Sequence, residues 1–143
     1  MQVRELMNRS VVSIAPDESV ALAARLLGRH NLGALPVCAR DGSLVGIVTD
    51  RDIVVRCIAA GEDPLRVPVA DIMSPHPVTV APTATIPTVA SAMARSQIRR
   101  LPVTQDGQVV GMLSLGDLAR CRKCDTEAAQ ALGDICASAK QRK

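Results

Sequence analysis

Apolar residues recur along this chain in two spacings, and each spacing occurs in both halves. The first spacing, i, i+3, i+4 and i+7, marks one buried face of a helix. It is followed each time by two short apolar segments separated by a turn, which predict a β-hairpin. The helical spacing is formed by Val20, Ala23, Ala24 and Leu27 in the first half, and by Ile86, Val89, Ala90 and Met93 in the second.

These spacings predict one order of elements for each half: strand, helix, strand, turn, strand, helix. The first half is expected to contain a strand at 11–14, a helix from Ser19 to about His30, hairpin strands at 35–38 and 44–48, and a helix from about Asp50 with Ile53, Val54, Cys57 and Ile58 on one face. The second half is expected to contain a strand at 78–80, a helix at 85–96, hairpin strands at 101–104 and 109–113, and a helix from about Leu115. One more helix is expected at 125–139, docked on a repeat or on a partner chain.

Residue identities repeat as well as spacings. Leu35-Pro36-Val37 returns as Leu101-Pro102-Val103, and Gly46-Ile47-Val48-Thr49-Asp50-Arg51-Asp52 returns as Gly111-Met112-Leu113-Ser114-Leu115-Gly116-Asp117. The hairpin turn is one residue shorter in the second copy, and a surface turn absorbs a deletion easily. The chain is therefore a tandem duplication.

The duplication predicts an α+β fold of two half-domains. Repeat 1 is assigned to residues 1–62 and repeat 2 to residues 63–123, followed by a C-terminal helix and basic tail at 124–143. A small sheet with helices on one face leaves its other face apolar and uncovered. We therefore expect the half-domains to pack sheet to sheet about a pseudo-two-fold axis.

The composition is that of a folded protein. The chain has 143 residues, of which 48% are hydrophobic and 22% charged, enough for one ordinary domain or two half-domains sharing a core. No apolar stretch approaches the roughly 18 residues of a membrane span. The first residues also lack the apolar core of a secretory signal, so we expect a cytoplasmic protein without a membrane partner.

Charge and aromatic content argue against a nucleic-acid partner. The formal net charge is +3, and a nucleic-acid-binding protein usually presents a denser basic face. The chain has no Phe, Tyr or Trp, which removes the stacking platforms of many single-strand and RNA binders.

The sequence offers little for catalysis or metal binding. No nucleophile, base and orienting group recur at a useful spacing, so we expect no enzyme. The pair Cys121 and Cys124 has CxxC spacing, but it lacks a second such pair or nearby histidines for zinc. We favour incidental or buried cysteines over a redox or metal role, with Cys38 in the core.

The repeated segment Gly-x-x-[Thr/Ser]-x-x-Asp lies at an expected strand–helix junction. One interpretation is a capping box, in which Thr49 or Ser114 caps the helix and Asp52 or Asp117 returns the bond. The other is a ribonucleotide site. The free N–H groups of a helix start and the hydroxyl suit a phosphate, and the carboxylate can accept bonds from vicinal ribose hydroxyls. The recurrence of the motif favours two related ligand sites.

Together these motifs resemble a tandem pair of CBS domains, also called a Bateman module, over about Val3 to Arg120. The chain is similar to small stand-alone bacterial CBS-pair proteins of the hypoxic response protein type, through His30 to Val37 and Thr49 to Val54. The resemblance implies a regulatory or stress-response module, usually a disc-like homodimer, that binds AMP, ADP, ATP, S-adenosylmethionine or a dinucleotide. It implies no required cofactor. Since no enzyme or transporter is attached, the protein effector would be regulated in trans.

The resemblance also assigns residues to the two sites. Thr49 and Asp52 would hold phosphate and ribose in one site, and Ser114 and Asp117 in the other. The adenine would contact first-strand residues and the residues beside the motif glycines: Val11, Val12, Pro77, Val78, Ile47 and Met112.

The two sites are not expected to be equal. The second copy has Arg99-Arg100 where the first has Gly33-Ala34. Two guanidiniums beside a phosphate site would add charge-assisted bonds, so a phosphate-rich ligand is expected to prefer that cleft. A solvated basic pair is the alternative interpretation. For the whole chain, the alternative is a stress-associated structural dimer with clefts that bind no nucleotide, acting by protein–protein contact.

Overall fold

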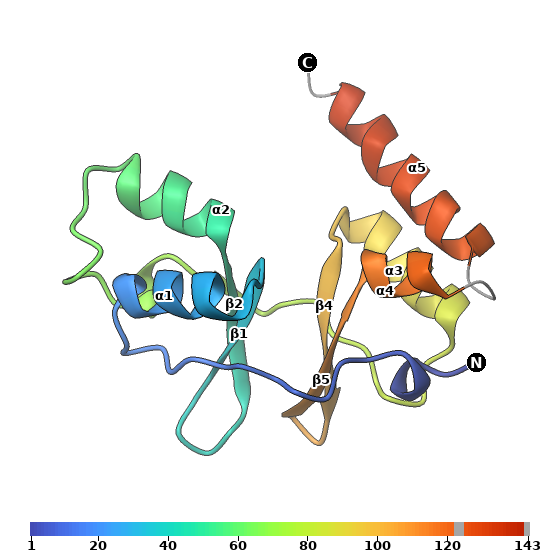
Figure 1. Cartoon of the computed structure of the whole chain (residues 1–143), viewed down its shortest axis with the longest axis horizontal. Helices are drawn as coiled ribbons and strands as arrows, with labels where there is room; N and C mark the ends of the chain where they lie inside the picture. Colours follow the sequence, from blue (N-terminus) through green and yellow to red (C-terminus); the bar gives the residue numbers. More distant parts are fainter. Residues whose placement is uncertain (122–124, 142–143) are drawn as a thin grey trace. The chain divides into compact units, whose positions relative to one another are not determined.

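A computed structural model describes residues 1–121 and 125–141, and it divides the chain into two compact units (Figure 1). The Thr49 unit comprises residues 12–77. The Ser114 unit comprises residues 1–11 together with the chain from Val78 onward. The units are thus cut at 11/12 and 77/78, whereas the boundary at 62/63 describes the duplication in the sequence. Each repeat contributes its first segment to the unit that carries the other repeat's motif.

The Thr49 unit is a small antiparallel sheet with helices packed against it. Ser19 begins the first helix, because its Oγ accepts a hydrogen bond from the backbone N–H of Leu22 at 3.1 Å. The strand order is β1-β2-β3. The elements are α1 (Val20–His30), β1 (Ala34–Cys38), β2 (Leu44–Thr49), α2 (Asp50–Asp52), the π-helix η2 (Ile53–Ile58), the 3-10 helix η3 (Val69–Asp71) and β3 (Ser74–Pro75).

The Ser114 unit repeats this arrangement around a two-stranded hairpin. Asp106 and Gly107 form the hairpin turn with φ of 54° and 78°, the backbone that a two-residue turn with matching twist requires. The C-terminal helix contacts two other helices of this unit, which confirms the expected docking on a repeat. The elements are the 3-10 helix η1 (Val3–Glu5), α3 (Ile86–Ser96), β4 (Arg100–Gln105), β5 (Gln108–Ser114), α4 (Leu115–Arg120) and α5 (Asp125–Gln141).

The strands expected at 11–14 and 78–80 do not form. Only Ile14 and Val80 reach the sheets, each through a single parallel bridge to Val37 and Val103 respectively. Each segment begins at a crossing between units, 11/12 or 77/78, and its other residues make no β pairing. The third strand beside β2 is instead β3, from the segment that precedes the second repeat.

The glycines of the motif make room for these exchanged segments. A Cβ at Gly46 would stand 2.5 Å from Met73 Sδ, and one at Gly111 would stand 2.6 Å from Met7 Sδ. Because Met7 and Met73 are equivalent in the duplication, the same close contact is made in both units. The glycines therefore serve packing of the exchanged segments.

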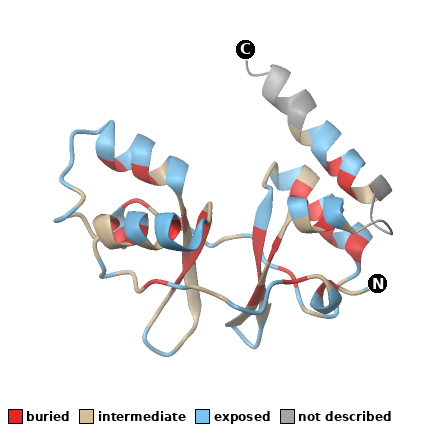
Figure 2. Ribbon diagram, in the orientation of Figure 1, coloured by how far each residue is buried: buried red, intermediate tan, exposed pale blue. Residues whose placement is uncertain are grey.

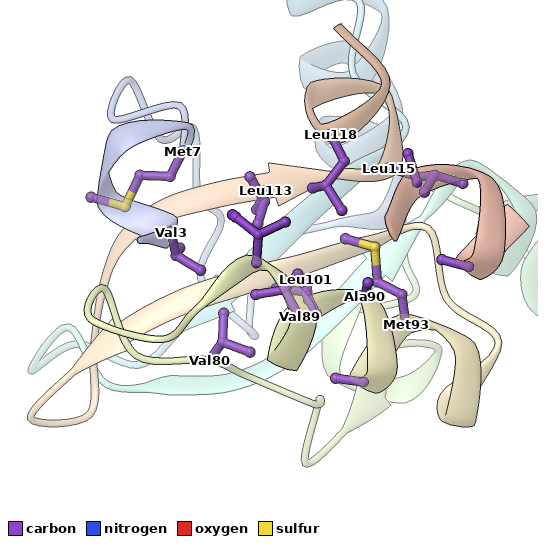
Figure 3. Packing of buried hydrophobic residues seen from close by; sticks show 14 of the residues in the cluster. Val3, Met7, Val80, Val89, Ala90, Met93, Leu101, Leu113, Leu115 and Leu118 are labelled. Carbon is purple, nitrogen blue, oxygen red and sulfur yellow. The ribbon is translucent and has the colours of Figure 1, made fainter. Parts of the chain in front are cut away.

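Two hydrophobic cores follow the predicted pattern closely. Figure 3 shows Val3 and Met7 of the N-terminal segment in one cluster with hairpin and helix residues of the Ser114 unit. In that unit all four predicted positions of α3 are buried. The side chains with no exposed surface at equivalent hairpin positions are Leu35, Val37 and Val48 in one unit and Leu101, Val103 and Leu113 in the other.

Three predicted core residues are exposed instead. Ala24 is exposed, and among the described residues no helix packs on α1 as extensively as α5 packs on α3. Figure 2 shows α1 with exposed stretches along its length. Val54 and Ile58 are 58% and 53% exposed, while Ile53 and Cys57 of the same helix are buried. The i→i+5 bonds of this π-helix, such as Ala59 N–H to the Val54 carbonyl at 2.8 Å, widen each turn and narrow its buried face.

Candidate functional site

Both hydroxyl–aspartate motifs are capping boxes at a strand–helix junction. In the Thr49 unit, Thr49 Oγ1 accepts from the Asp52 N–H at 3.1 Å, and Asp52 Oδ2 accepts from the Thr49 N–H at 2.9 Å. The corresponding bonds of Ser114 and Asp117 measure 3.1 and 2.8 Å. The capping interpretation is confirmed in both copies. It leaves the hydroxyl hydrogen and the second carboxylate oxygen, Oδ1, outside the box.

The motif hydroxyls lie on the same face of each hairpin as the predicted adenine contacts on β2 and β5. Side chains alternate along a strand, so Ile47 and Thr49 share one face, as do Met112 and Ser114. Both Ile47 and Met112 are half-buried. Each unit therefore brings an apolar side chain and the capping hydroxyl together on one surface, next to the helix start.

Arg100 of the predicted arginine pair also lies at this surface, and the backbone of Arg99 contacts the helix start. Arg100 is paired directly with Ser114 across the hairpin, so the two side chains lie on the same face. The carbonyl of Arg99 accepts a hydrogen bond from the Leu115 N–H at 2.7 Å, and both arginine side chains are exposed. In the Thr49 unit, Ala34 occupies the position equivalent to Arg100, opposite Thr49. The difference predicted from the sequence, an arginine in one copy and an alanine in the other, thus lies next to the motif hydroxyl.

The four first-strand residues lie at the two crossings between units. Val11 and Val12 are half-buried on either side of one crossing, and Pro77 and Val78 flank the other. Val78 is 40% exposed. Since each pair is divided between the units, the structure described for one unit does not bring both members to one motif. Their contact with adenine stays a prediction.

Sequence reasoning missed two residues beside the motif carboxylates. Arg56 Nε lies 3.9 Å from Asp52 Oδ1, and Arg120 donates to Asp117 Oδ1. The spacing could have revealed both pairs: Asp52 and Arg56 are i, i+4, and Asp117 and Arg120 are i, i+3. On a helix these spacings place an acidic and a basic side chain next to each other.

The cysteines form no recognisable centre in the part of the chain that the structure describes. Burial raises the pKa of the Cys57 thiol, and the nearby charges of Glu62 and Asp63 raise it further. Cys38 is half-buried rather than in the core, because it ends β1, and burial also raises its pKa. Cys124 and the side chain of Cys136 lie outside the described residues. Among the side chains that the structure describes, those of residues 1–121 and 127–135, no group of three or more His, Cys, Asp or Glu is placed to hold a metal.

Comparison with known proteins identifies the duplicated unit. The model of the family described as CBS domain matches residues 3–58 and 69–123. The CBS domain-containing protein YhcV of Bacillus subtilis is 38% identical over 93% of this chain and 94% of its own length. Hypoxic response protein 1 of Mycobacterium tuberculosis is 35% identical over 82% of each chain, which confirms the resemblance to that type. The CBS domain protein PAE2072 from Pyrobaculum aerophilum, solved in complex with AMP, superposes with a TM-score of 0.81 at 31% identity, covering 90% of this chain and 98% of that one.

Within the described residues, no helix combines the length and apolar character needed to cross a membrane.

Proposed function

Because this chain belongs to the CBS-domain family, we propose that it is a regulatory module that binds adenosine-containing ligands at its two motifs and acts on a partner protein in trans. One observation carries the proposal: the hydroxyl–aspartate pair occurs twice, at equivalent strand–helix junctions, with an apolar side chain on the same face. The AMP bound to a relative of the same fold supports an adenylate-type ligand.

The proposed chemistry uses the groups outside the capping boxes. The hydroxyls of Thr49 and Ser114 keep a hydrogen that can be donated to a phosphate oxygen. Oδ1 of Asp52 and Asp117 can accept a bond from a ribose hydroxyl. Ile47 and Met112, with the crossing residues Val11, Val12, Pro77 and Val78, would supply apolar contacts to the base. AMP, ADP, ATP and dinucleotides all present this combination. S-adenosylmethionine presents the adenine and the ribose hydroxyls but carries no phosphate.

We propose that the Ser114 site is the better phosphate site. Arg100, directly opposite Ser114, adds a positive charge where Ala34 adds none, and Arg99 adds a second. A phosphate bound there would gain charge-assisted hydrogen bonds that the Thr49 site lacks.

An exposed apolar surface supports the proposed homodimer. Val54, Val55 and Ile58 lie within little more than one turn of η2 and are 58%, 49% and 53% exposed. Apolar side chains gathered on one helix surface are typical of a protein–protein contact. Val54→Asp should convert a dimer into a monomer in light scattering, whereas Glu62→Ala, at an exposed polar residue nearby, should not.

Ligand titration of the full chain tests the proposal. Isothermal titration with AMP, ATP and S-adenosylmethionine should give heat for at least one of them, together with a rise in the unfolding temperature. Since the chain contains no Phe, Tyr or Trp, an adenine ligand that co-purifies should also stand out in the absorbance near 260 nm. Absence of binding by all three would favour the alternative, a structural dimer that acts by protein–protein contact.

Substitution of each aspartate tests the site residues. Asp52→Asn and Asp117→Asn keep an oxygen for the capping box but remove the charge, so each should weaken binding at its own site without unfolding its unit. The exposed Asp17→Asn is the matched control and should leave binding unchanged. If both variants abolish binding at both sites, the assignment of two separate sites is wrong.

A further inference from the structure

The arginine beside Asp52 is held by more than that carboxylate. Arg56 Nη1 donates to the backbone carbonyl of Ile72 at 3.1 Å and to that of Met73 at 3.3 Å. Its Nε lies 3.9 Å from Asp52 Oδ1. Since Ile72 and Met73 precede β3 and pack against the sheet of the Thr49 unit, Arg56 is fixed to the backbone of that unit.

Within the described residues, the arginine beside Asp117 is held by that carboxylate. Among the residues described by the structure, Asp117 Oδ1 is the hydrogen-bond partner of the Arg120 guanidinium. The Arg120 side chain is 73% exposed, against 51% for Arg56. A phosphate that approaches Arg120 therefore has to displace one exposed ion pair, and such pairs contribute little stability.

A glycine places Arg120 next to the motif hydroxyl. A Cβ at Gly116 would stand 3.4 Å from Arg120 Nη1 and 3.5 Å from Ser114 Oγ. The guanidinium and the hydroxyl therefore lie on either side of Gly116, which has no side chain between them. In the first repeat this position carries the side chain of Arg51, and the residue equivalent to Arg120 is the apolar Val55. The Thr49 site therefore has no counterpart of this arrangement.

The start of the helix also differs between the two sites. In the Thr49 unit, Asp50 Oδ1 accepts from the Arg51 N–H at 2.9 Å, so a second carboxylate lies beside the motif. The equivalent residue in the Ser114 unit is Leu115, which has no charge. An anion meets two aspartates at the first motif and one at the second.

We infer that Arg120 is a phosphate-binding residue of the Ser114 site, and that this site selects phosphorylated adenosyl ligands over uncharged nucleosides while the Thr49 site does not. The inference rests on the proposed function. When Arg120 turns from Asp117 to a phosphate, Asp117 Oδ1 becomes available to a ribose hydroxyl. Phosphate binding by Arg120 and ribose binding by Asp117 are thus coupled. At the Thr49 site this coupling does not occur, because Arg56 is fixed to the backbone.

Calorimetry with AMP and adenosine as probes tests the inference, since these two ligands differ by the phosphate. The full chain carries Asp52→Asn in every sample, so that the heat reports the Ser114 site. In this background, Arg120→Gln should weaken AMP binding about 10-fold and leave adenosine binding unchanged or slightly tighter. Arg120→Lys, which keeps the charge, should lose less. Arg56→Gln removes an arginine from the other motif helix and should leave the ratio of the two dissociation constants unchanged.

The reciprocal background completes the test. With Asp117→Asn in place of Asp52→Asn, the remaining Thr49 site should bind AMP and adenosine with similar affinity. Equal weakening of AMP and adenosine by Arg120→Gln, or no weakening of either, overturns the inference while the proposed function stands. If the unsubstituted chain binds neither probe nor the other adenosyl ligands, the proposed function fails and the inference fails with it.

Discussion

The Thr49 unit and the Ser114 unit contain the same hairpin and the same capping box, yet their helices are covered differently. In the Ser114 unit, α5 lies against α3 and α4, and Ala90 is buried. The equivalent Ala24 of the Thr49 unit is exposed, and η2 of that unit presents Val54 and Ile58 to solvent. One sequence pattern thus gives two degrees of burial, because burial depends on whether another element lies over the helix.

The same comparison applies to the candidate sites. Thr49 and Ser114 make equivalent capping bonds, so the local backbone is the same in both. The charged groups around them differ, with Arg100 in place of Ala34 and a differently held arginine at each aspartate. Duplication preserved the scaffold of the site, and single substitutions around it set its electrostatics.

The largest effect is expected where α5 covers the Ser114 unit. Ala131 is 1% exposed, and Ala131→Asp would bury a charge without a partner. We expect a loss of about 2–4 kcal/mol from the free energy of unfolding, or release of α5, measured by chemical denaturation and by hydrogen exchange in α3. Ala129→Asp, on the exposed side of the same helix, is the control and should change stability by less than about 0.5 kcal/mol. If hydrogen exchange became faster in α1 as well as in α3, the conclusion that α5 covers only the Ser114 unit would be contradicted.

A moderate effect is expected at the motif glycines, where the two units are predicted to respond alike. Gly46→Ala would place a Cβ 2.5 Å from Met73 Sδ, and Gly111→Ala would place one 2.6 Å from Met7 Sδ, with backbone carbonyls at 3.0 and 3.1 Å. Each variant should lose about 1–3 kcal/mol of stability in a denaturant titration, because the methionine and the exchanged segment must move.

The control for these glycine variants lies in α1. A Cβ at Gly28 would meet nothing within 4 Å, so Gly28→Ala should gain up to about 1 kcal/mol from the better helix propensity of alanine. A neutral result at one motif glycine and a large loss at the other would show that the exchanged segments are not packed equivalently.

The smallest effect is expected at alkaline pH, from two thiols of the Thr49 unit. Burial raises the pKa of Cys38 and Cys57 above their ordinary value of 9.0 in the folded chain. As pH rises past that value, the unfolded chain loses these protons first, so the free energy of unfolding declines, by less than about 1.4 kcal/mol per pH unit for each thiol. Below it, both states keep the protons and no dependence arises.

Variants that lack these two thiols isolate this pH effect. In denaturant titrations between about pH 8 and 10, the double variant Cys38→Ala/Cys57→Ala should show a flatter decline than the unsubstituted chain. Single variants show which thiol contributes more, and we expect Cys57, because its side chain has no exposed surface. An identical decline in the double variant would assign the pH dependence to other groups.

Much of the fold could be predicted from local patterns. The capped helix after Ser19, the hairpin across Asp106-Gly107 and the capping boxes at Thr49 and Ser114 all depend on residues close in sequence. The predicted strand at 11–14 was wrong. Only Ile14 of this segment pairs with a sheet, and the segment contains the crossing from one unit to the other.

The candidate site shows the same division. The hydroxyls, the aspartates and Arg99-Arg100 were visible as differences and identities between the two copies. The different contacts of Arg56 and Arg120 could not be predicted from the sequence. Arg56 donates hydrogen bonds to the carbonyls of Ile72 and Met73, which are distant from it in sequence.

The sequence by itself determined the duplication, the helix and the hairpin of each repeat, the equivalent hairpin cores and the two motifs. Each of these follows from hydrophobic spacing, capping and turn chemistry acting over a few residues. Only the tertiary structure decided which repeat each N-terminal segment packs on, which helix is covered by α5, and which arginine is fixed. These outcomes depend on surfaces that meet only after the chain has folded, so no local pattern specifies them.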